Sequence, residues 1–276
     1  MTKHPPVKVL STYELFQLFP DEQAAIDYLA GILWPNGPVC PYCGSKRNSP
    51  RKDNFHRCKD CRKDFTIRVG TIFERSHIPL HKWMYAIYMI VTSRKGVSSL
   101  QLSKELGITQ KSAWFLEQRI RAACGNQTSK LLAGIVEVDE AYLGGLEKNK
   151  HTNKKLKQGR GTVGKTPVFG IRDRLTGQVL ARVVDATDAP TLQGVIKANV
   201  VPCSLVCTDE HASYNGLNGQ YIHKAVKHSA KQFVDGMAHT NGIESVWAVL
   251  KRGFYGIYHS FSRKHTQFYI RLVRKL

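Results

Sequence analysis

The segment Ile135-Val-Glu-Val-Asp139 decides the fold, because it is a short, β-branched, apolar run that ends in an aspartate. A second segment, Ser204-Leu-Val-Cys-Thr-Asp209, is built in the same way. Runs of this composition between turn residues are typical of β-strands, and two more lie at Val168–Arg172 and Val179–Asp185. The sequence therefore predicts a sheet in which two strands end in an aspartate.

A third acidic residue, Glu244, lies in the helix-like stretch Asn241–Gly253, and 34 residues separate it from Asp209. Another short helix is expected at Pro190–Asn199, so the fold class is α/β. Carboxylates gathered at sheet ends offer the oxygen ligands that Mg²⁺ prefers. A pair of such ions stabilises the attacking and leaving oxygens of a phosphodiester. We expect Asp139, Asp209 and Glu244 to bind two magnesium ions and to catalyse cleavage of a phosphodiester.

Two neighbouring acids are alternatives to the aspartates. Glu140 and Glu210 directly follow Asp139 and Asp209, but strand alternation predicts that they point away. Glu137 shares the predicted face of Asp139 and is a candidate for supporting the site.

The predicted helix of Glu244 carries further candidates. Lys251 lies two turns after Glu244, where its amine is expected to reach a substrate phosphate; the alternative is an exposed helix lysine. His239 and Asn241 either orient the site or cap the helix.

The charge of the chain indicates its partner. Its 276 residues include 41 Lys and Arg against 21 Asp and Glu, a net charge of +20. Such an excess favours a polyanion such as nucleic acid over a merely soluble basic protein. No apolar stretch approaches the ~20 residues of a membrane helix, and the N-terminus lacks the apolar core of a signal peptide. We expect a cytoplasmic, nucleoid-associated protein that binds no membrane.

Four of the seven cysteines form two Cys-x-x-Cys pairs, Cys40-Pro-Tyr-Cys43 and Cys58-Lys-Asp-Cys61, separated by fourteen residues. Two such turns supply the four thiolates of a tetrahedral zinc site. Residues 37–75 are therefore predicted to be a zinc ribbon, with unliganded cysteines as the alternative. A helical segment, 11–36, precedes the ribbon, and Asp21 is its expected internal N-cap.

Residues 76–126 are expected to be helical, with a helix-turn-helix candidate at Ser98–Leu116. Gly107 supplies the turn and Thr109 can cap the second helix. The first turn of that helix is where such motifs read bases. The residues expected to contact DNA there are Gln110, Lys111 and Ser112. Leu100, Leu102 and Leu106 are expected to pack the first helix. Arg119 and Arg121 are expected to contact phosphates. An αα-hairpin that only supports the next domain is the alternative.

The stretch Gly159-Arg-Gly-Thr-Val-Gly-Lys-Thr166 matches the P-loop pattern. A P-loop needs a strand before it and a helix after it, whereas here a lysine-rich loop precedes and a strand-like run follows. Nucleotide binding is therefore rejected. We expect a basic loop whose Lys155, Arg160 and Lys165 contact the DNA backbone.

Taken in order, several stretches resemble one known family: the DDE transposases of bacterial insertion sequences with an N-terminal zinc ribbon, relatives of the eukaryotic Merlin elements. The matching stretches are Cys40-Pro-Tyr-Cys-Gly-Ser45, Phe65-Thr-Ile-Arg-Val-Gly-Thr71, Val138-Asp-Glu-Ala-Tyr-Leu-Gly-Gly145, Arg160-Gly-Thr-Val-Gly-Lys-Thr-Pro-Val-Phe-Gly170, Thr208-Asp-Glu210, His239-Thr-Asn-Gly-Ile-Glu-Ser-Val-Trp247 and Leu250-Lys-Arg252.

The resemblance implies an RNase H-like catalytic domain at 132–265, with Asp139, Asp209 and Glu244 as its triad and Lys251 as a lysine that follows the third acid. It also implies magnesium-dependent cleavage at terminal inverted repeats and strand transfer into target DNA. Residues 266–276 depart from the longer helical end of this family and are expected to be an atypical tail. Holding two DNA ends favours a homo-oligomer, at least a dimer. The alternative function is a catalytically inactive, transposase-derived DNA-binding regulator.

Overall fold

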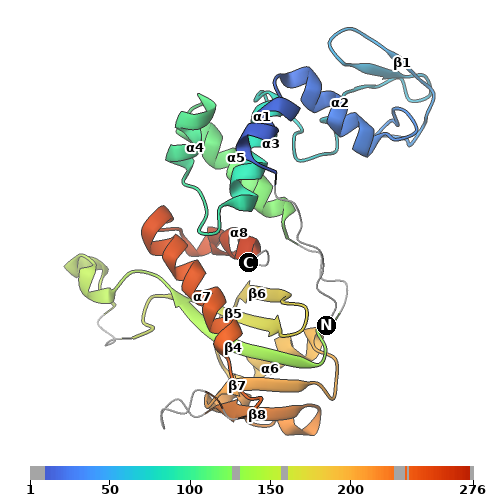
Figure 1. Ribbon diagram of the computed structural model, residues 1–276. Coiled ribbons are helices and arrows are strands. Elements are labelled where there is room, and N and C mark those ends of the chain that lie inside the picture. The colour runs from blue at the N-terminus through green and yellow to red at the C-terminus, as the bar shows by residue number, and fades with distance from the viewer. Residues whose placement is uncertain (1–9, 126–130, 157–160, 227–233, 235, 274–276) are drawn as a thin grey trace. The chain divides into compact units, whose positions relative to one another are not determined.

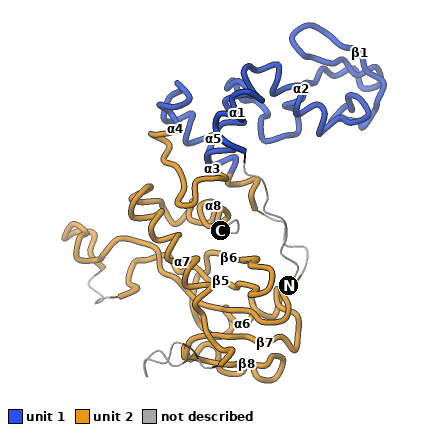
Figure 2. Tube along the Cα trace, in the orientation of Figure 1, with its two compact units in different colours: residues 1–90, 102–120 blue, residues 91–101, 121–276 orange. Residues whose placement is uncertain are grey.

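The chain divides into two compact units. The computed structural model describes residues 10–125, 131–156, 161–226, 234 and 236–273 (Figure 1). One unit comprises residues 1–90 and 102–120, and the other comprises residues 91–101 and 121–276 (Figure 2). In the described part of the chain, no helix combines the length and the apolar character needed to cross a membrane.

The first unit is helical around a small antiparallel sheet. Asp21 caps α2 as predicted, since its Oδ1 accepts a hydrogen bond from the Ala24 N–H at 2.9 Å. Its complete elements are α1 (Thr12–Leu18), α2 (Glu22–Leu33), β1 (Asn48–Pro50), β2 (His56–Cys58) and β3 (Asp64–Phe65). Three further helices belong to it in part: α3 (Leu80–Thr92) up to Ile90, α4 (Ser99–Leu106) from Leu102, and α5 (Gln110–Ala123) up to Ile120.

The second unit is built on one five-stranded sheet of order β6-β5-β4-β7-β8. The pairs β4–β5 and β5–β6 are antiparallel, whereas β4–β7 and β7–β8 are parallel. This mixed α/β arrangement is the RNase H-like fold expected from the sequence. The strands are β4 (Ile135–Leu143), β5 (Thr166–Asp173), β6 (Val179–Val183), β7 (Leu205–Asp209) and β8 (Ile222–Val226).

Helices cover both faces of this sheet (Figure 1). Successive strand residues face opposite sides, so β4 contributes to two separate cores. Val136 and Val138 pack with α6 (Ala189–Asn199), whereas Ala141 and Leu143 pack with α7 (Asn241–Gly253) and α8 (Arg263–Val273). Shorter helical turns are η1 (Glu147–Asn149), η2 (Thr152–Lys154), η3 (Ala212–Tyr214), η4 (Leu217–Gly219) and the π-helical η6 (Phe254–Tyr258).

A missing side chain allows α7 to lie close to the sheet. Gly170 of β5 is buried, and a Cβ added there would come within 2.5 Å of Cζ2 of Trp247 on α7. The indole therefore occupies space that any other residue at 170 would fill. This close approach brings Glu244, one turn before Trp247, toward the strand ends.

One strand near the C-terminus differs from the sequence-based expectation. The edge strand β8 was not predicted, because His223 and Lys224 interrupt its apolar pattern. Residues 266–273 of the expected atypical tail belong to α8, which buries Thr266 and Ile270, and the Gln267 side chain accepts a hydrogen bond from the Val183 N–H at 2.8 Å. This contact closes the free edge of β6.

Candidate functional site

Two of the three predicted acids meet at the ends of adjacent strands. β4 and β7 run parallel with Glu137 opposite Cys207. Asp139 and Asp209 lie two residues farther along each strand, so they leave on the same face. Carboxylate oxygens of Asp139, Glu140 and Asp209 all lie within 4.8 Å of one another. We call these three residues the acidic cluster.

The position of Glu140 corrects the prediction from strand alternation. β4 and β7 pair only as far as Glu137 and Cys207, so no ladder closes the space between the strands beyond that point. The long Glu140 side chain reaches this space from the opposite face of β4. Its Oε1 is buried without a hydrogen-bond partner among the described residues. A buried, unsatisfied carboxylate oxygen is costly unless a cation or proton compensates it.

The electrostatics of the acidic cluster favour a cation. Burial, together with the negative charges of Glu140, Asp209 and Glu244, raises the pKa of Asp139 to about 7. Burial, together with the charge of Asp209, likewise raises the pKa of Glu140 to about 7. Carboxylate oxygens this close repel each other, and a divalent ion between them removes that repulsion. The donor set therefore fits a hard cation such as Mg²⁺.

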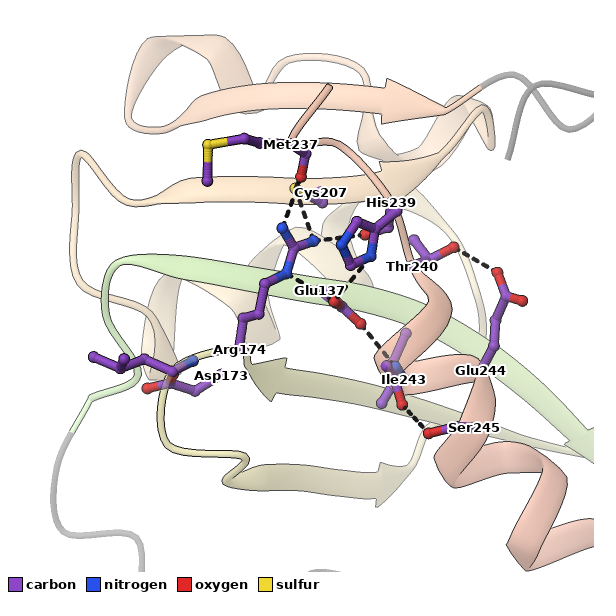
Figure 3. A network of polar contacts seen from close by, with 12 residues as sticks. Glu137, Asp173, Arg174, Cys207, Met237, His239, Thr240, Ile243, Glu244 and Ser245 are labelled. Carbon is purple, nitrogen blue, oxygen red and sulfur yellow. Dashed lines mark hydrogen bonds and ion pairs between the residues drawn. The ribbon is translucent and has the colours of Figure 1, made fainter. Parts of the chain in front are cut away.

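Glu244 approaches the cluster from α7 but is not part of the tight group. Its charge contributes to the raised pKa of Asp139. Its Oε1 accepts a hydrogen bond from the Thr240 hydroxyl at 2.6 Å (Figure 3). Lys251 and Asn241 are exposed on the same helix, and Asn241 is its first residue. Thr240, rather than Asn241, occupies the cap position.

His239 lies beside the site rather than in it. Its Nδ1 is 3.3 Å from Oε1 of Glu137, a carboxylate that is fully buried on the α7 side of β4. Figure 3 shows Glu137 and His239 side by side, and a supporting role for Glu137 stays a prediction.

The four predicted zinc ligands come together in the ribbon. Their sulfur atoms all lie within 4.8 Å of one another, with Cys40–Cys61 and Cys43–Cys58 Sγ separations of 3.6 Å. Tetrahedral zinc with Zn–S bonds of about 2.3 Å requires sulfur atoms about 3.8 Å apart. Hydrogen bonding from the backbone N–H groups of Cys61 and Asp60 lowers the pKa of the Cys58 thiol to about 6, which favours the thiolate that zinc binds. The site fits zinc.

The turn between α4 and α5 has the features of a helix-turn-helix. Gly107 has a φ of +60°, and the Thr109 hydroxyl accepts a hydrogen bond from the Ser112 N–H at 3.2 Å. Gln110 and Lys111 are exposed in the first turn of α5, and Ser112 is half-buried. Leu102 and Leu106 are buried as predicted. Leu100 is not: it lies on the opposite side of α4 and is 51% exposed.

The two arginines expected on phosphates have roles inside the protein. Nη1 of Arg119 donates to the carbonyls of Ile72 at 3.1 Å and Glu74 at 2.6 Å. Arg121 contradicts the prediction outright, because it is fully buried with its guanidinium 4.2 Å from the Tyr269 ring centroid. Arg121 follows the helical period that also buries Leu116 and Ile120, and its charge alone gives no sign of this. Arg119 lies beside that face and is half-buried.

The basic loop is only partly described. Lys155 is exposed and Lys165 is half-buried, whereas Arg160 lies outside the described residues. β5 begins at Thr166, directly after the Gly-rich stretch, so a strand stands where a P-loop requires a helix. This confirms that the P-loop pattern is coincidental.

Comparison with known proteins identifies the family. The ISXO2-like transposase domain matches residues 131–274, more than half of the chain, and the transposase zinc-ribbon domain matches residues 20–64. The chain belongs to the ISXO2-like transposase family. A protein in transposable element ISH50 of Halobacterium salinarum is 30% identical over 248 residues, covering 85% of this chain and 83% of the relative.

The family match also covers α8, the helix in the segment expected to be atypical. Among solved structures, a chain of a simian T-cell lymphotropic virus intasome in complex with the PP2A regulatory subunit B56 gamma has 13% identity and a TM-score of 0.32 over 63% of each chain. Nothing about this transposase-family chain follows from so distant a likeness.

Proposed function

We propose that this chain binds the terminal inverted repeats of an insertion sequence, cleaves the DNA there and transfers the strand to a target. The observation that carries the proposal is the acidic cluster at the ends of β4 and β7, faced by Glu244 from α7. In a transposase-family chain, a partly buried group of carboxylates is suited to binding divalent cations for phosphoryl transfer.

We assign Asp139, Asp209 and Glu244 as magnesium ligands and as the catalytic acids. Glu140 is added as a fourth oxygen donor because its carboxylate shares the 4.8 Å group. When bound, two magnesium ions would activate the attacking oxygen and stabilise the leaving one. The protein holds the carboxylates in place and shields them partly from solvent. Lys251 is exposed on α7 and is proposed to contact the substrate phosphate.

DNA recognition is assigned to the exposed basic and polar surfaces. Gln110, Lys111 and Ser112 begin α5, where a docked helix would meet base edges. Lys155, Lys165 and Arg160 belong to the loop before β5 and are proposed to neutralise backbone phosphates. The net charge of +20 supports a polyanionic partner.

The remaining assignments follow from this reaction. Zinc in the ribbon is proposed to be structural, since four thiolates leave no open ligand position. Two DNA ends must be held together for joining, so we propose at least a dimer on DNA, acting at the nucleoid. We propose that the chain is divided by function into an N-terminal helical segment, a zinc ribbon, a DNA-binding region and a catalytic domain. These are residues 11–36, 37–75, 76–126 and 132–265, and the tail 266–276 follows them.

The test uses purified, zinc-loaded protein and a labelled duplex that carries an end of the element. Wild type with Mg²⁺ is expected to produce a nicked or cut end and then a joined product, and Asp209→Asn is expected to bind the duplex without cutting it. Asp185→Asn is the matched control, because the Asp185 side chain is fully exposed and lies outside the cluster. Cleavage by Asp209→Asn at the wild-type rate would refute the assignment. Binding without cleavage by wild type would favour the inactive regulator.

A further inference from the structure

Glu137 is a fully buried carboxylate that accepts two hydrogen bonds and lies beside a histidine ring nitrogen. Its Oε1 accepts a hydrogen bond from Nε of Arg174 at 2.9 Å and lies 3.3 Å from Nδ1 of His239. Its Oε2 accepts a hydrogen bond from the Ile243 N–H at 2.8 Å (Figure 3). A carboxylate this buried is stable only when both oxygens are satisfied, so each donor is required.

The bond to Ile243 makes Glu137 the cap of α7. Ile243 is the third residue of the helix, and its N–H is one of those that have no partner within the helix. A side chain at the N-cap normally fills this role, but Thr240 makes no cap hydrogen bond. The Thr240 hydroxyl is bound to Glu244 instead. A strand residue thus caps the helix, and the cap residue orients the catalytic acid.

Arg174 extends the same network to β7. Beyond Glu137, its guanidinium donates to the carbonyls of Met237 at 2.7 Å and His239 at 3.0 Å, and to Sγ of Cys207 at 3.9 Å. The segment that leads into α7 is therefore fixed to β4 and β7 by one planar side chain. Lysine has a single ammonium and lacks this fork of donors.

Three of the four proposed metal ligands lie within two residues of a member of this network, and Glu140 is the exception, on the opposite face of β4. Asp139 follows Glu137 by two residues, Asp209 follows Cys207 by two residues, and Glu244 follows Ile243. Residues two apart on a strand share a face, so the network and the two aspartates occupy successive positions on the same surface.

Gly242 allows the close approach on which the network depends. A Cβ at this position would lie 2.5 Å from Oε2 of Glu137 and would also collide with Nη1 of Arg172. An alanine here must therefore separate the helix end from the Glu137 carboxylate, through movement of either one, while every charge stays in the protein.

We infer that the buried Glu137–Arg174 pair is the positioning element that sets the spacing of Asp139, Asp209 and Glu244 for a divalent cation. This inference rests on the proposed function. In that function Glu137 and Arg174 contact neither the metal nor the DNA. They act by fixing β4, β7 and α7 relative to one another. Residues that orient metal ligands typically change metal affinity about 10- to 100-fold when replaced.

The test measures Mn²⁺ affinity by calorimetry and electron paramagnetic resonance, without DNA, on zinc-loaded full-length protein. Mn²⁺ prefers the same oxygen donors as Mg²⁺. Glu137→Gln places an amide donor against either the Arg174 or the Ile243 donor, and Gly242→Ala separates the helix end from Glu137. Both are expected to weaken Mn²⁺ binding at least about tenfold. Cleavage is expected to recover partly at high metal concentration, a response that a general loss of stability does not produce.

Two controls separate positioning from stability. Gly194→Ala in α6 is also a helical glycine replacement, but nothing lies within 4 Å of the added Cβ, so its Mn²⁺ affinity should equal that of wild type. Val195→Ala removes buried surface on the other face of the sheet and should lower the melting temperature without changing Mn²⁺ affinity.

Wild-type affinity in a folded Gly242→Ala protein would overturn the inference even if Glu137→Gln does not fold. A different outcome would count against the proposed function itself: wild type binds no Mn²⁺, or Asp209→Asn binds it as well as wild type does.

Discussion

The zinc ribbon and the acidic cluster are both suited to metal, yet they are built in opposite ways. The ribbon takes four ligands from 22 consecutive residues, 40–61, around a small core of Cys40, Cys58 and Phe65. The acidic cluster takes its carboxylates from two strands far apart in the chain, between two large cores. In the ribbon the metal substitutes for a core, whereas in the second unit the core assembles the metal site.

The two sites also differ in the pKa values of their side chains. Cys58 has a lowered pKa because backbone N–H groups stabilise its thiolate. A backbone hydrogen bond from Ser45 lowers the pKa of Cys43, but burial and the neighbouring cysteines outweigh it and raise that pKa to about 12. Asp139 has a raised pKa because burial and like charges oppose its ionisation. The ribbon therefore loses order when its metal leaves, and the acidic cluster becomes less strained when it is protonated or loses a charge.

Metal removal should give the largest contrast between the two sites. Structural zinc contributes about 10–16 kcal/mol of apparent binding free energy, so chelation should unfold residues 37–75. The sheet of the second unit should remain folded, because the two cores that flank it are formed by apolar side chains and the acidic cluster is not part of either core. Hydrogen exchange resolved by segment measures both. Retained protection in the zinc-free ribbon, or lost protection in β4 and β5, would contradict the comparison.

Neutralising one acid should separate activity from stability. Asp139→Asn removes a buried charge that Glu140 and Asp209 repel, so the metal-free melting temperature should rise. Cleavage should fall on the order of 100- to 1,000-fold or more, since the variant loses an oxygen ligand. Thermal unfolding and end cleavage are measured on the same preparation, with Asp185→Asn as the control. A less stable or fully active Asp139→Asn protein would argue against a strained cluster.

Overpacking the contact between α7 and β5 should affect only the second unit. Gly170→Ala forces the new Cβ against Trp247 and should lower the free energy of unfolding by about 1–3 kcal/mol. Denaturant unfolding measures this, with Gly194→Ala expected to be neutral or slightly stabilising. Zinc content should be unchanged in both variants. Equal stabilities of the two alanine variants would show that α7 does not depend on this contact.

The smallest expected effect is on pH dependence. The pKa of Asp139 is about 7, above the usual value of about 3.9, so between those values the unfolded chain is ionised and the folded metal-free chain is protonated. Folding of the metal-free unit therefore loses stability as pH rises from about 4 to 7. Mg²⁺ binds the ionised form, so it should raise the melting temperature more at pH 8 than at pH 6. An equal or reversed shift would argue against carboxylate ligands with raised pKa values.

The comparison also explains what the sequence predicts well. The ribbon and the α4–α5 turn are local: Cys-x-x-Cys spacing, Gly107 and Thr109 fix geometry over a few residues. Asp139 and Asp209 end apolar runs, and parallel strands bring their ends together. These features need no knowledge of distant packing.

The remaining parts depend on contacts between distant segments. Glu140 joins the cluster only because β4 and β7 stop pairing at Glu137 and Cys207. Arg174 looks like an ordinary turn residue in the sequence, and its role needs the carbonyls of Met237 and His239 in place. The helical burial of Arg121 was concealed by its charge. Acids or arginines at the periodic positions of otherwise apolar segments are the sequence signal for such buried pairs.

The most direct test of the central claim is an excision assay in cells. A marker is flanked by the DNA that borders this gene, and wild type is compared with Asp209→Asn and Asp185→Asn. If the acidic cluster cuts the element ends, wild type and Asp185→Asn excise the marker and Asp209→Asn does not. Excision by Asp209→Asn at the wild-type frequency would contradict the account.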